Sequence, residues 1–448
     1  MRRELLVALA LVLAGCSAPA LPGPIGGPSH PETPTGEDAI GWEDGYWYDD
    51  PVAVTTEDGL NESELEAVTA RTMARVEQLR GLEFESTVPV EVISRAEYRN
   101  RSGSGGGGAG PPRDPWNDQV WESLLLIGED SGSSEAIDDT LSTAVQGFYS
   151  PSRDEIVVVA PTETPAVDRR TLAHELVHAL QDQQFGLNGS AETQDTQLAR
   201  DGIVEGDANY VEALYERRCG NGWRCLDRPE RGGSSGGGGG SSVNEGLFTV
   251  IIQPYATGPR FVDTRRESGG WDAVDTVYED YPDSTEQVLH PEKYPEEEPV
   301  NVTVRDRSND EWRRFDHDPV ADTVGEASIF ATMYHNNQTD ADRYSYDSAP
   351  SVGWGGDTVV PYHDGDGNGG YVWRSTWDTE EDAREFARAY RAALVDEHGA
   401  TQPRQNVYVV PDSSPFEDAF HVVRRGDTVR IVNGPTVEDL GEIHAPAG

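Results

Sequence analysis

One short segment carries two histidines and a glutamate at a spacing that suits metal chemistry. His174, Glu175 and His178 form the pattern His-Glu-x-x-His. On a helix, side chains four positions apart lie one above the other, so both imidazoles can reach one cation. Glu175 then projects beside them, where its carboxylate can take a proton from a water on the metal. The spacing therefore predicts a zinc site with His174 and His178 as ligands and Glu175 as the catalytic base.

A catalytic zinc needs three protein ligands and one open position for water. We predict that Glu205 is the third ligand, because the chain between His178 and Glu205 is long enough for a loop and a returning helix. Gly206 and Ala208 are small and would let that second helix approach the first closely. Other acids on the same segment remain alternatives for the third ligand: Asp201, Asp207 and Glu212.

Two further roles have candidates near these residues. Asp201 and Asn209 lie one turn either side of Glu205. We expect them to orient the histidines by contacting the side of each ring that faces away from the metal. Hydrolysis of a carbonyl also needs a donor for the developing oxyanion, for which Tyr210 and His290 are the candidates. A packing role for Tyr210 and a structural role for His290 remain the alternatives.

Longer strings of sequence resemble known proteins. A His-Glu-x-x-His helix with a glutamate on a second helix resembles the gluzincin branch of the zincin metallopeptidases. The local strings are more similar to a group of uncharacterised, zincin-like surface lipoproteins of haloarchaea and bacteria. This resemblance covers most of residues 60–435 and implies a zincin-like fold and a zinc ion more than a reaction, because the group has no secure substrate. If the chain is a peptidase, its expected partner is a peptide or protein substrate. The strings that carry it are 147–149, 174–182, 204–208, 255–259, 284–291, 353–357 and 373–386.

The elements that must hold these residues can be predicted from caps and periodicity. Residues 61–80 have the pattern of an amphipathic helix with Asn61 as the cap and Glu64 closing the capping box. Residues 88–93 have the pattern of a strand, and residues 147–160 that of a hairpin. The His-Glu-x-x-His helix is expected to begin with Thr164 as its cap and Pro165 at its first position, and a second helix to span about 195–217. The strand Ile156 to Ala160 is a candidate to pair with an extended peptide.

The C-terminal half has the pattern of mixed α and β structure. Thr379 can cap a helix that Gly399 ends, and strands are expected over 405–410, 421–423 and 428–432. The predicted class is α+β, with a zincin-like core in which the metal helix packs on a small sheet beside a second ligand-bearing helix. We expect one unit divided as follows: a signal peptide with lipobox (1–16), a Pro/Gly-rich tether (17–45), a zincin-like metal-binding part (46–231), a Gly/Ser insertion (232–242) and a C-terminal α+β part that completes the same unit (243–448).

The N-terminus has the features of an export signal. A basic start is followed by an apolar run and by Leu-Ala-Gly-Cys, which ends at Cys16 and resembles a lipobox. This pattern predicts a lipid on Cys16 and attachment to the extracellular face of the cell membrane; an ordinary signal cleaved nearby is the alternative. Outside the cell, the two remaining cysteines, Cys219 and Cys225, are expected to form a disulfide, with free thiols or a metal pair as alternatives.

The charge of the 448-residue chain is strongly negative. It has 35 basic and 81 acidic side chains, for a net charge of −46, and Lys293 is its single lysine. Nucleic acid is therefore excluded as a partner, because no basic stripe exists to neutralise phosphates. Molar salt would screen the self-repulsion, so we expect a protein adapted to very high salt.

Two questions stay open at this stage. The stretch from Asp364 to Asn368 has alternating oxygen ligands like a calcium loop but lacks the distant glutamate, and an acidic turn is the alternative. The favoured function is a zinc-dependent peptidase. The alternatives are a non-catalytic zinc-containing surface lipoprotein with a structural or ligand-capture role, and an acidic lipoprotein whose histidine spacing is accidental.

Overall fold

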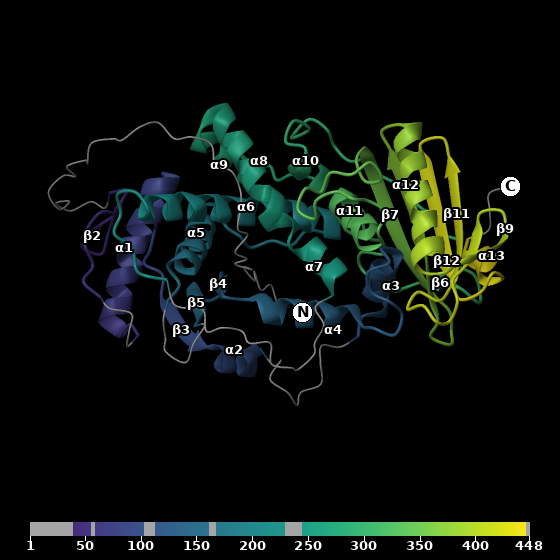
Figure 1. The fold of residues 1–448 in the computed structure, drawn as a ribbon, viewed down its shortest axis with the longest axis horizontal. Helices are drawn as coiled ribbons and strands as arrows, with labels where there is room; N and C mark the ends of the chain where they lie inside the picture. The colour runs from purple at the N-terminus through teal and green to yellow at the C-terminus, as the bar shows by residue number, and fades with distance from the viewer. Residues whose placement is uncertain (1–38, 55–58, 103–112, 161–166, 229–243, 445–448) are drawn as a thin grey trace.

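The structure is a computed structural model that describes residues 39–54, 59–102, 113–160, 167–228 and 244–444. The expected signal peptide, the tether up to residue 38 and the Gly/Ser insertion lie outside these residues. Within the described ranges, no helix has both the length and the apolar character needed to cross a bilayer. The molecule is elongated, with the first long helix near one end and the C-terminal sheet at the other (Figure 1).

The chain up to residue 228 builds the helices and strands around the predicted metal residues. In chain order they are β1 (Trp42–Glu43), β2 (Tyr46–Trp47), α1 (Glu62–Arg80), β3 (Val90–Ser94), α2 (Arg95–Ser102), α3 (Pro115–Ser123), α4 (Ser133–Ala144), β4 (Gly147–Ser150), β5 (Glu155–Ala160), α5 (Arg169–Phe185) and α6 (Gln194–Cys219).

The remainder of the chain adds a helical layer and a large sheet. Its elements are α7 (Glu245–Ile251), α8 (Gln253–Gly269), α9 (Trp271–Glu279), α10 (Thr285–Leu289), β6 (Arg313–Arg314), α11 (Gly325–His335), β7 (Trp354–His363), β8 (Gly369–Trp377), α12 (Glu380–Ala392) with a π-helical turn (Ala393–Glu397), β9 (Thr401–Arg404), β10 (Val407–Val409), β11 (Ala419–Arg425), β12 (Thr428–Gly434) and α13 (Asp439–His444). The mixture of helices and separate sheets confirms the α+β class.

Two helices begin at the residues predicted from the sequence, and the helix with the two histidines does not. Asn61 and Glu64 form the capping box that begins α1, and Thr379 forms one with Asp382 at α12. The helix α5, in contrast, begins at Arg169, where the side chain of Asp168 accepts a hydrogen bond from the backbone of Arg170. The predicted start at Thr164 and Pro165 is therefore wrong, and those two residues lie outside the described ranges.

The small sheet lies against α5 and has the order β3-β5-β4. β5 pairs with β3 in parallel and with β4 in antiparallel orientation. Because β5 has a neighbour on both sides, its backbone groups are already bonded and it cannot accept an extended peptide. The prediction that Ile156 to Ala160 pairs with a peptide is wrong; β4 is an edge strand of this sheet.

The long helix α6 runs beside α5 and α8 near the middle of the molecule (Figure 1). A Cβ added to Gly206 would lie 2.5 Å from the carbonyl carbon of Gly258 in α8. Gly206 therefore lets α6 approach α8, not α5 as predicted. Ala208 does pack with the α5 residues in one apolar cluster. At the end of α6 the sulfur atoms of Cys219 and Cys225 are bonded, with Cα atoms 5.4 Å apart.

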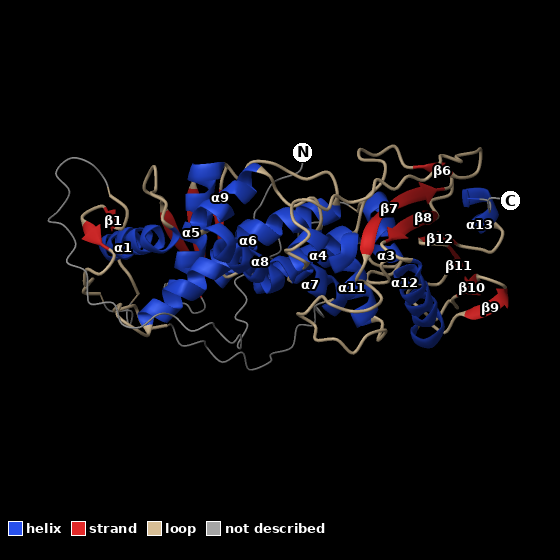
Figure 2. Cartoon of the chain, turned by 90° about the horizontal axis from the view of Figure 1, so that it is seen from above, coloured by secondary structure: helices blue, strands red, loops and turns tan. Residues whose placement is uncertain are grey.

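The C-terminal sheet has the strand order β6-β7-β8-β12-β11-β10-β9, and all its pairs are antiparallel. Successive residues of a strand point to opposite faces, and this sheet is covered on both. Trp373 packs with Phe386 of α12 and with α3 on one face, whereas Val372 packs with Ile443 of α13 on the other. Figure 2 shows α12 and α13 beside this sheet.

Candidate metal centre

The helix α5 is fixed by its apolar side chains and buries its polar ones. Leu172, Leu176 and Val177 pack with residues of β4, β5 and α6 in one cluster. This packing leaves His174 wholly buried and His178 2% exposed. Two imidazoles held away from water need partners, because burying an unpaired polar group costs free energy.

The partners of the two imidazoles are each other and Glu205 of α6. Nε2 of His174 and Nε2 of His178 are 3.1 Å apart, and Oε2 of Glu205 lies 3.2 Å from the first and 3.3 Å from the second. Ligands at about 2.0 to 2.1 Å from a tetrahedral zinc lie about 3.4 Å from one another. The three atoms thus form a triangle of the size that one zinc ion needs, and these residues could hold a metal ion.

Electrostatics favour a cation at the centre of this triangle. Burial raises the pKa of Glu205, but the positive charges of His178 and His174 outweigh burial and lower it to about 2. Burial lowers the pKa of His174, but its contacts with Glu205 and Glu212 outweigh burial and raise it to about 10. The carboxylate therefore stays ionised and attracts positive charge, which protons or a metal ion can supply.

Glu175 is buried beside the ligands without a hydrogen bond of its own. Its side chain is wholly buried, and both carboxylate oxygens lack a hydrogen-bond partner. Burial raises its pKa to about 7, against the lowering effect of His174 and His178. Gly147 of β4 makes room for it, because a Cβ there would lie 3.0 Å from Oε1 of Glu175. A carboxyl group with a pKa near neutrality suits proton transfer.

Nδ1 of each imidazole, the nitrogen outside the triangle, faces a residue that the sequence did not predict to orient the histidines. Nδ1 of His178 lies 2.9 Å from Oε1 of Gln181, and Nδ1 of His174 lies 3.4 Å from Oε2 of Glu212. The prediction that Asp201 and Asn209 fill this role is therefore wrong. Periodicity offered a signal for both: Gln181 is one turn after His178, and Glu212 is two turns after Glu205 on the same face.

The amide of Gln181 continues into a buried network. Its Nε2 donates to the carbonyl oxygen of Val204 at 2.9 Å and lies 2.8 Å from the hydroxyl of Tyr278. Tyr278 in turn donates to Asp207 at 2.9 Å, and Nε of Arg80 lies 3.0 Å from the same carboxylate. Asp207 is thus held by Arg80 and Tyr278, so it is not the third ligand. The network fixes the position of His178.

A cavity of about 630 Å³ reaches the third ligand. Both Glu205 and Asp201 line it, and Asp201 accepts a hydrogen bond from Gln197 at 2.8 Å. The other rival acid, Glu212, bonds Arg170 behind His174. Of the four acids considered for the third ligand, Glu205 alone completes the group of three possible ligands with the histidines. The remaining walls of the cavity include aromatic and apolar side chains, among them Trp116, Trp121, Leu187, Ile251 and Tyr255.

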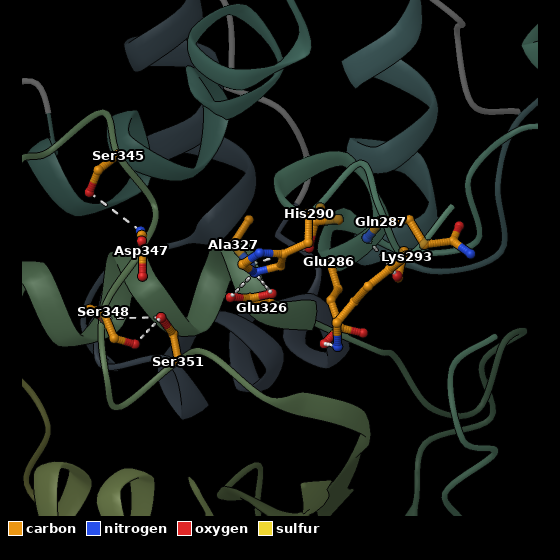
Figure 3. Close-up of polar contacts among 12 residues, drawn as sticks. Glu286, Gln287, His290, Lys293, Glu326, Ala327, Ser345, Asp347, Ser348 and Ser351 are labelled. Carbon is orange, nitrogen blue, oxygen red and sulfur yellow. Dashed lines mark hydrogen bonds and ion pairs between the residues drawn. The ribbon is translucent and has the colours of Figure 1, made fainter. Parts of the chain in front are cut away.

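The two oxyanion candidates lie in other networks. Tyr210 donates to Asp263 at 2.6 Å and accepts from Arg266 at 3.0 Å. His290 pairs with Glu326, whose carboxylate oxygens lie 3.0 and 3.1 Å from Nε2 (Figure 3). Both residues have partners away from the metal ligands, which fits their structural alternatives.

The stretch from Asp364 to Asn368 forms the turn between β7 and β8. Oδ1 of Asp364 accepts hydrogen bonds from the backbone of Asp366, Gly367 and Asn368, and Oδ2 accepts from the Asn368 side chain. These bonds lower the pKa of Asp364 against the effect of burial. The carboxylate is therefore occupied by its own turn, which is the acidic-turn alternative to a calcium loop.

Comparison with known proteins gives a match for the C-terminal part. A family model for a domain of unknown function, DUF8575, matches residues 313–444. No curated protein and no solved structure matches the chain. The matched segment includes every strand of the C-terminal sheet and begins after α5 and α6. It therefore describes the large sheet and contains none of the residues of the candidate metal centre.

Proposed function

We propose that this chain is a zinc-dependent peptidase of zincin-like architecture, held by a lipid on Cys16 at the extracellular face of the cell membrane. The observation that carries the reaction is the position of Glu175. Its carboxylate is buried without a hydrogen-bond partner on the same helix as two of three converging ligand atoms. A site kept only for structure needs the three ligands but has no need of an unpaired acid beside them.

Each residue of the site has a separate role in this proposal. His174, His178 and Glu205 would hold the ion, which when bound would polarise a carbonyl group and acidify a water. Glu175 would accept a proton from the attacking water and pass it to the leaving amine, and its raised pKa of about 7 suits proton transfer near neutral pH. Of these four residues Glu205 alone lines the cavity, so a substrate would approach the site from the side of Glu205, where the aromatic walls suit apolar side chains.

A second candidate is a non-catalytic zinc protein of the cell surface. The observation in its favour is that Tyr210 and His290, the proposed oxyanion donors, have other partners. In that case zinc would stabilise the packing of α5 against α6, and Glu175 would not take part in any reaction.

The test compares Glu175→Gln with His178→Ala in molar KCl. We expect Glu175→Gln to keep one zinc per chain and to lose casein hydrolysis by at least about 100-fold, because it lacks the base but keeps the ligands. We expect His178→Ala to lose the zinc. Metal analysis and release of labelled casein peptides give the two readouts.

The control is Glu216→Gln, the same change of acid to amide at a residue of α6 that pairs with Arg169 and belongs to neither the ligands nor the base. It should keep both zinc and activity. Stoichiometric zinc without turnover in the unaltered protein would select the non-catalytic candidate. Zinc retained by His178→Ala would overturn the ligand assignment.

A further inference from the structure

A second group of acids lies where α3 and its following loop meet the C-terminal sheet. Glu122 is in the last turn of α3, Glu129 is in the next loop and Asp418 directly precedes β11. One carboxylate oxygen from each lies within 4.8 Å of the other two. Glu129 also donates its backbone N–H to the carbonyl oxygen of Pro415 at 3.1 Å, so the two loops are in direct contact.

Two of these three carboxylates are removed from water, and the group has fewer hydrogen bonds than its oxygens can accept. Glu122 is 2% and Asp418 6% exposed, whereas Glu129 is partly exposed. Gln119 donates to Oε2 of Glu122 at 2.7 Å, and Asn433 donates to Oδ2 of Asp418 at 2.8 Å. Oε1 of Glu122 and Oε1 of Glu129 are buried and accept no hydrogen bond. Buried anionic oxygens without donors need a cation or a proton.

The chain contains a comparable acid cluster that carries its own cation. Glu286, Glu297 and Asp378 also bring three carboxylates together, and Nζ of Lys293 lies 2.8, 2.6 and 3.2 Å from them. Figure 3 shows Lys293 reaching Glu286. The single lysine of the sequence is thus used to neutralise this cluster.

No such side chain serves the first cluster. Over the described ranges, no lysine, arginine or histidine forms an ion pair with Glu122, Glu129 or Asp418. The nearby Arg113 pairs with Asp118 instead. Among the described residues, therefore, no side chain supplies the positive charge that this cluster needs.

The available ligands are all oxygens. Besides the carboxylates, Oε1 of Gln119, which lines the same cavity, is buried without a hydrogen-bond partner. Carboxylate and amide oxygens at distances of about 2.3 to 2.6 Å are the ligands that Ca²⁺ takes, often with water. A cavity of about 810 Å³ is lined by Gln119 and all three acids, which leaves room for an ion and its waters.

We propose that Glu122, Glu129 and Asp418 bind one calcium ion that ties α3 and its loop to the C-terminal sheet. The ion would connect a segment outside the residues matched by the family model to the sheet inside them. Partly exposed Glu129 gives the ion a route from solvent. The site shares no residue with the candidate zinc centre, so it does not depend on the proposed peptidase activity.

Protons are the competing source of positive charge. Burial raises the pKa of Glu129 to about 7 and that of Asp418 to about 8, with neighbouring acids adding to the effect. Burial also raises the pKa of Glu122 well above its ordinary value, so the cluster could be largely protonated even near neutral pH without any ion. Calcium and protons differ in one measurable respect, because only calcium binding makes stability depend on the calcium concentration at fixed pH.

The test uses the full-length chain, freed of calcium, loaded with zinc and kept in molar KCl at neutral pH. We expect calorimetric titration with CaCl₂ to show one site, and the melting temperature to rise by about 3 °C or more at saturation. Glu122→Gln and Asp418→Asn should each weaken calcium binding by at least about tenfold, because the charge of the ligands sets the affinity. Zinc content should stay at one ion per chain.

The matched control is Glu286→Gln, a change of one buried acid in the cluster that Lys293 neutralises; it should bind calcium like the unaltered protein. If Glu122→Gln does not fold, Glu129→Gln carries the test, because its side chain is partly exposed. Absence of calcium binding by the unaltered protein would overturn the proposal. So would equal calcium affinity in Glu122→Gln and the unaltered chain, or a melting temperature that responds to pH alone.

Discussion

The two imidazoles of the candidate metal centre have different partners at their Nδ1 atoms, on the side away from Glu205. Gln181 offers a neutral amide to His178, whereas Glu212 offers a carboxylate to His174 at 3.4 Å. A carboxylate behind a metal-bound imidazole fixes the ring and makes it a stronger ligand. Glu212 would therefore act on a bound metal only through the ring of His174, and this role can be tested apart from catalysis.

Replacement of Glu212 by Gln should weaken zinc binding by about 10- to 100-fold, because the ring loses the negative charge behind it. Competition with a chromophoric chelator in molar KCl measures the affinity. Glu216→Gln is the control, because Glu216 pairs with Arg169 much as Glu212 pairs with Arg170 but faces no histidine. Equal zinc affinity in Glu212→Gln and Glu216→Gln would contradict the role.

At the scale of elements, the contact between α6 and α8 sets where Glu205 lies. Glycines of the two helices meet there: a Cβ on Gly258 would lie 2.1 Å from the carbonyl oxygen of Gly202 and 2.8 Å from the Cα of Gly206. Side chains cannot move aside at this contact because the neighbouring atoms belong to the backbone. Any added carbon must push the helices apart and shift Glu205, the residue next to Gly206.

Gly206→Ala should lower the free energy of unfolding by about 1 to 3 kcal/mol, the usual effect of overpacking a filled interior. We also expect weaker zinc binding, since Glu205 moves with the backbone. Urea unfolding in molar KCl measures the first effect. The control is Gly441→Ala in α13, where an added Cβ meets no atom within 4 Å. An unfolding free energy unchanged by Gly206→Ala would show that the helices tolerate separation.

At the scale of the whole molecule, net charge governs the conditions under which these sites form. A charge of −46 produces repulsion across the fold, and positive charge comes almost entirely from arginine. Many described arginines pair with one or two acids, as Arg80 does with Asp207 and Asp275. Such pairs leave most of the acids without a counter-charge. Dissolved cations must therefore supply the remaining compensation.

The melting temperature should therefore rise steeply between about 0.1 M and about 1 M KCl, as the Debye length falls from about 10 Å to about 3 Å. Thermal unfolding followed by circular dichroism measures the effect. Sucrose of matched osmolality is the control, because it stabilises compact states without screening charge. A melting temperature that rises equally in sucrose would show that charge repulsion is not the cause.

Several features follow from the sequence because they are set within one or two helical turns. The spacing of His174 and His178 places both rings on one face, and the capping box at Asn61 begins a helix where predicted. The charge of the chain and its α+β class likewise follow from composition and pattern, and the hairpin at 147–160 follows from a short stretch of local sequence. For the histidine pair and the capping box, backbone geometry alone fixes which residues are neighbours.

Other features depend on which face of each element meets which partner, and these only the tertiary structure decided. Four acids of α6 could have met the histidines, and packing against α5 and α8 placed Glu205 at their Nε2 atoms and Glu212 at Nδ1 of His174. The central place of β5 and the meeting of Glu122 with Asp418 depend likewise on contacts between distant segments. Helical periodicity states which residues share a face, but burial of the apolar surface determines what that face contacts.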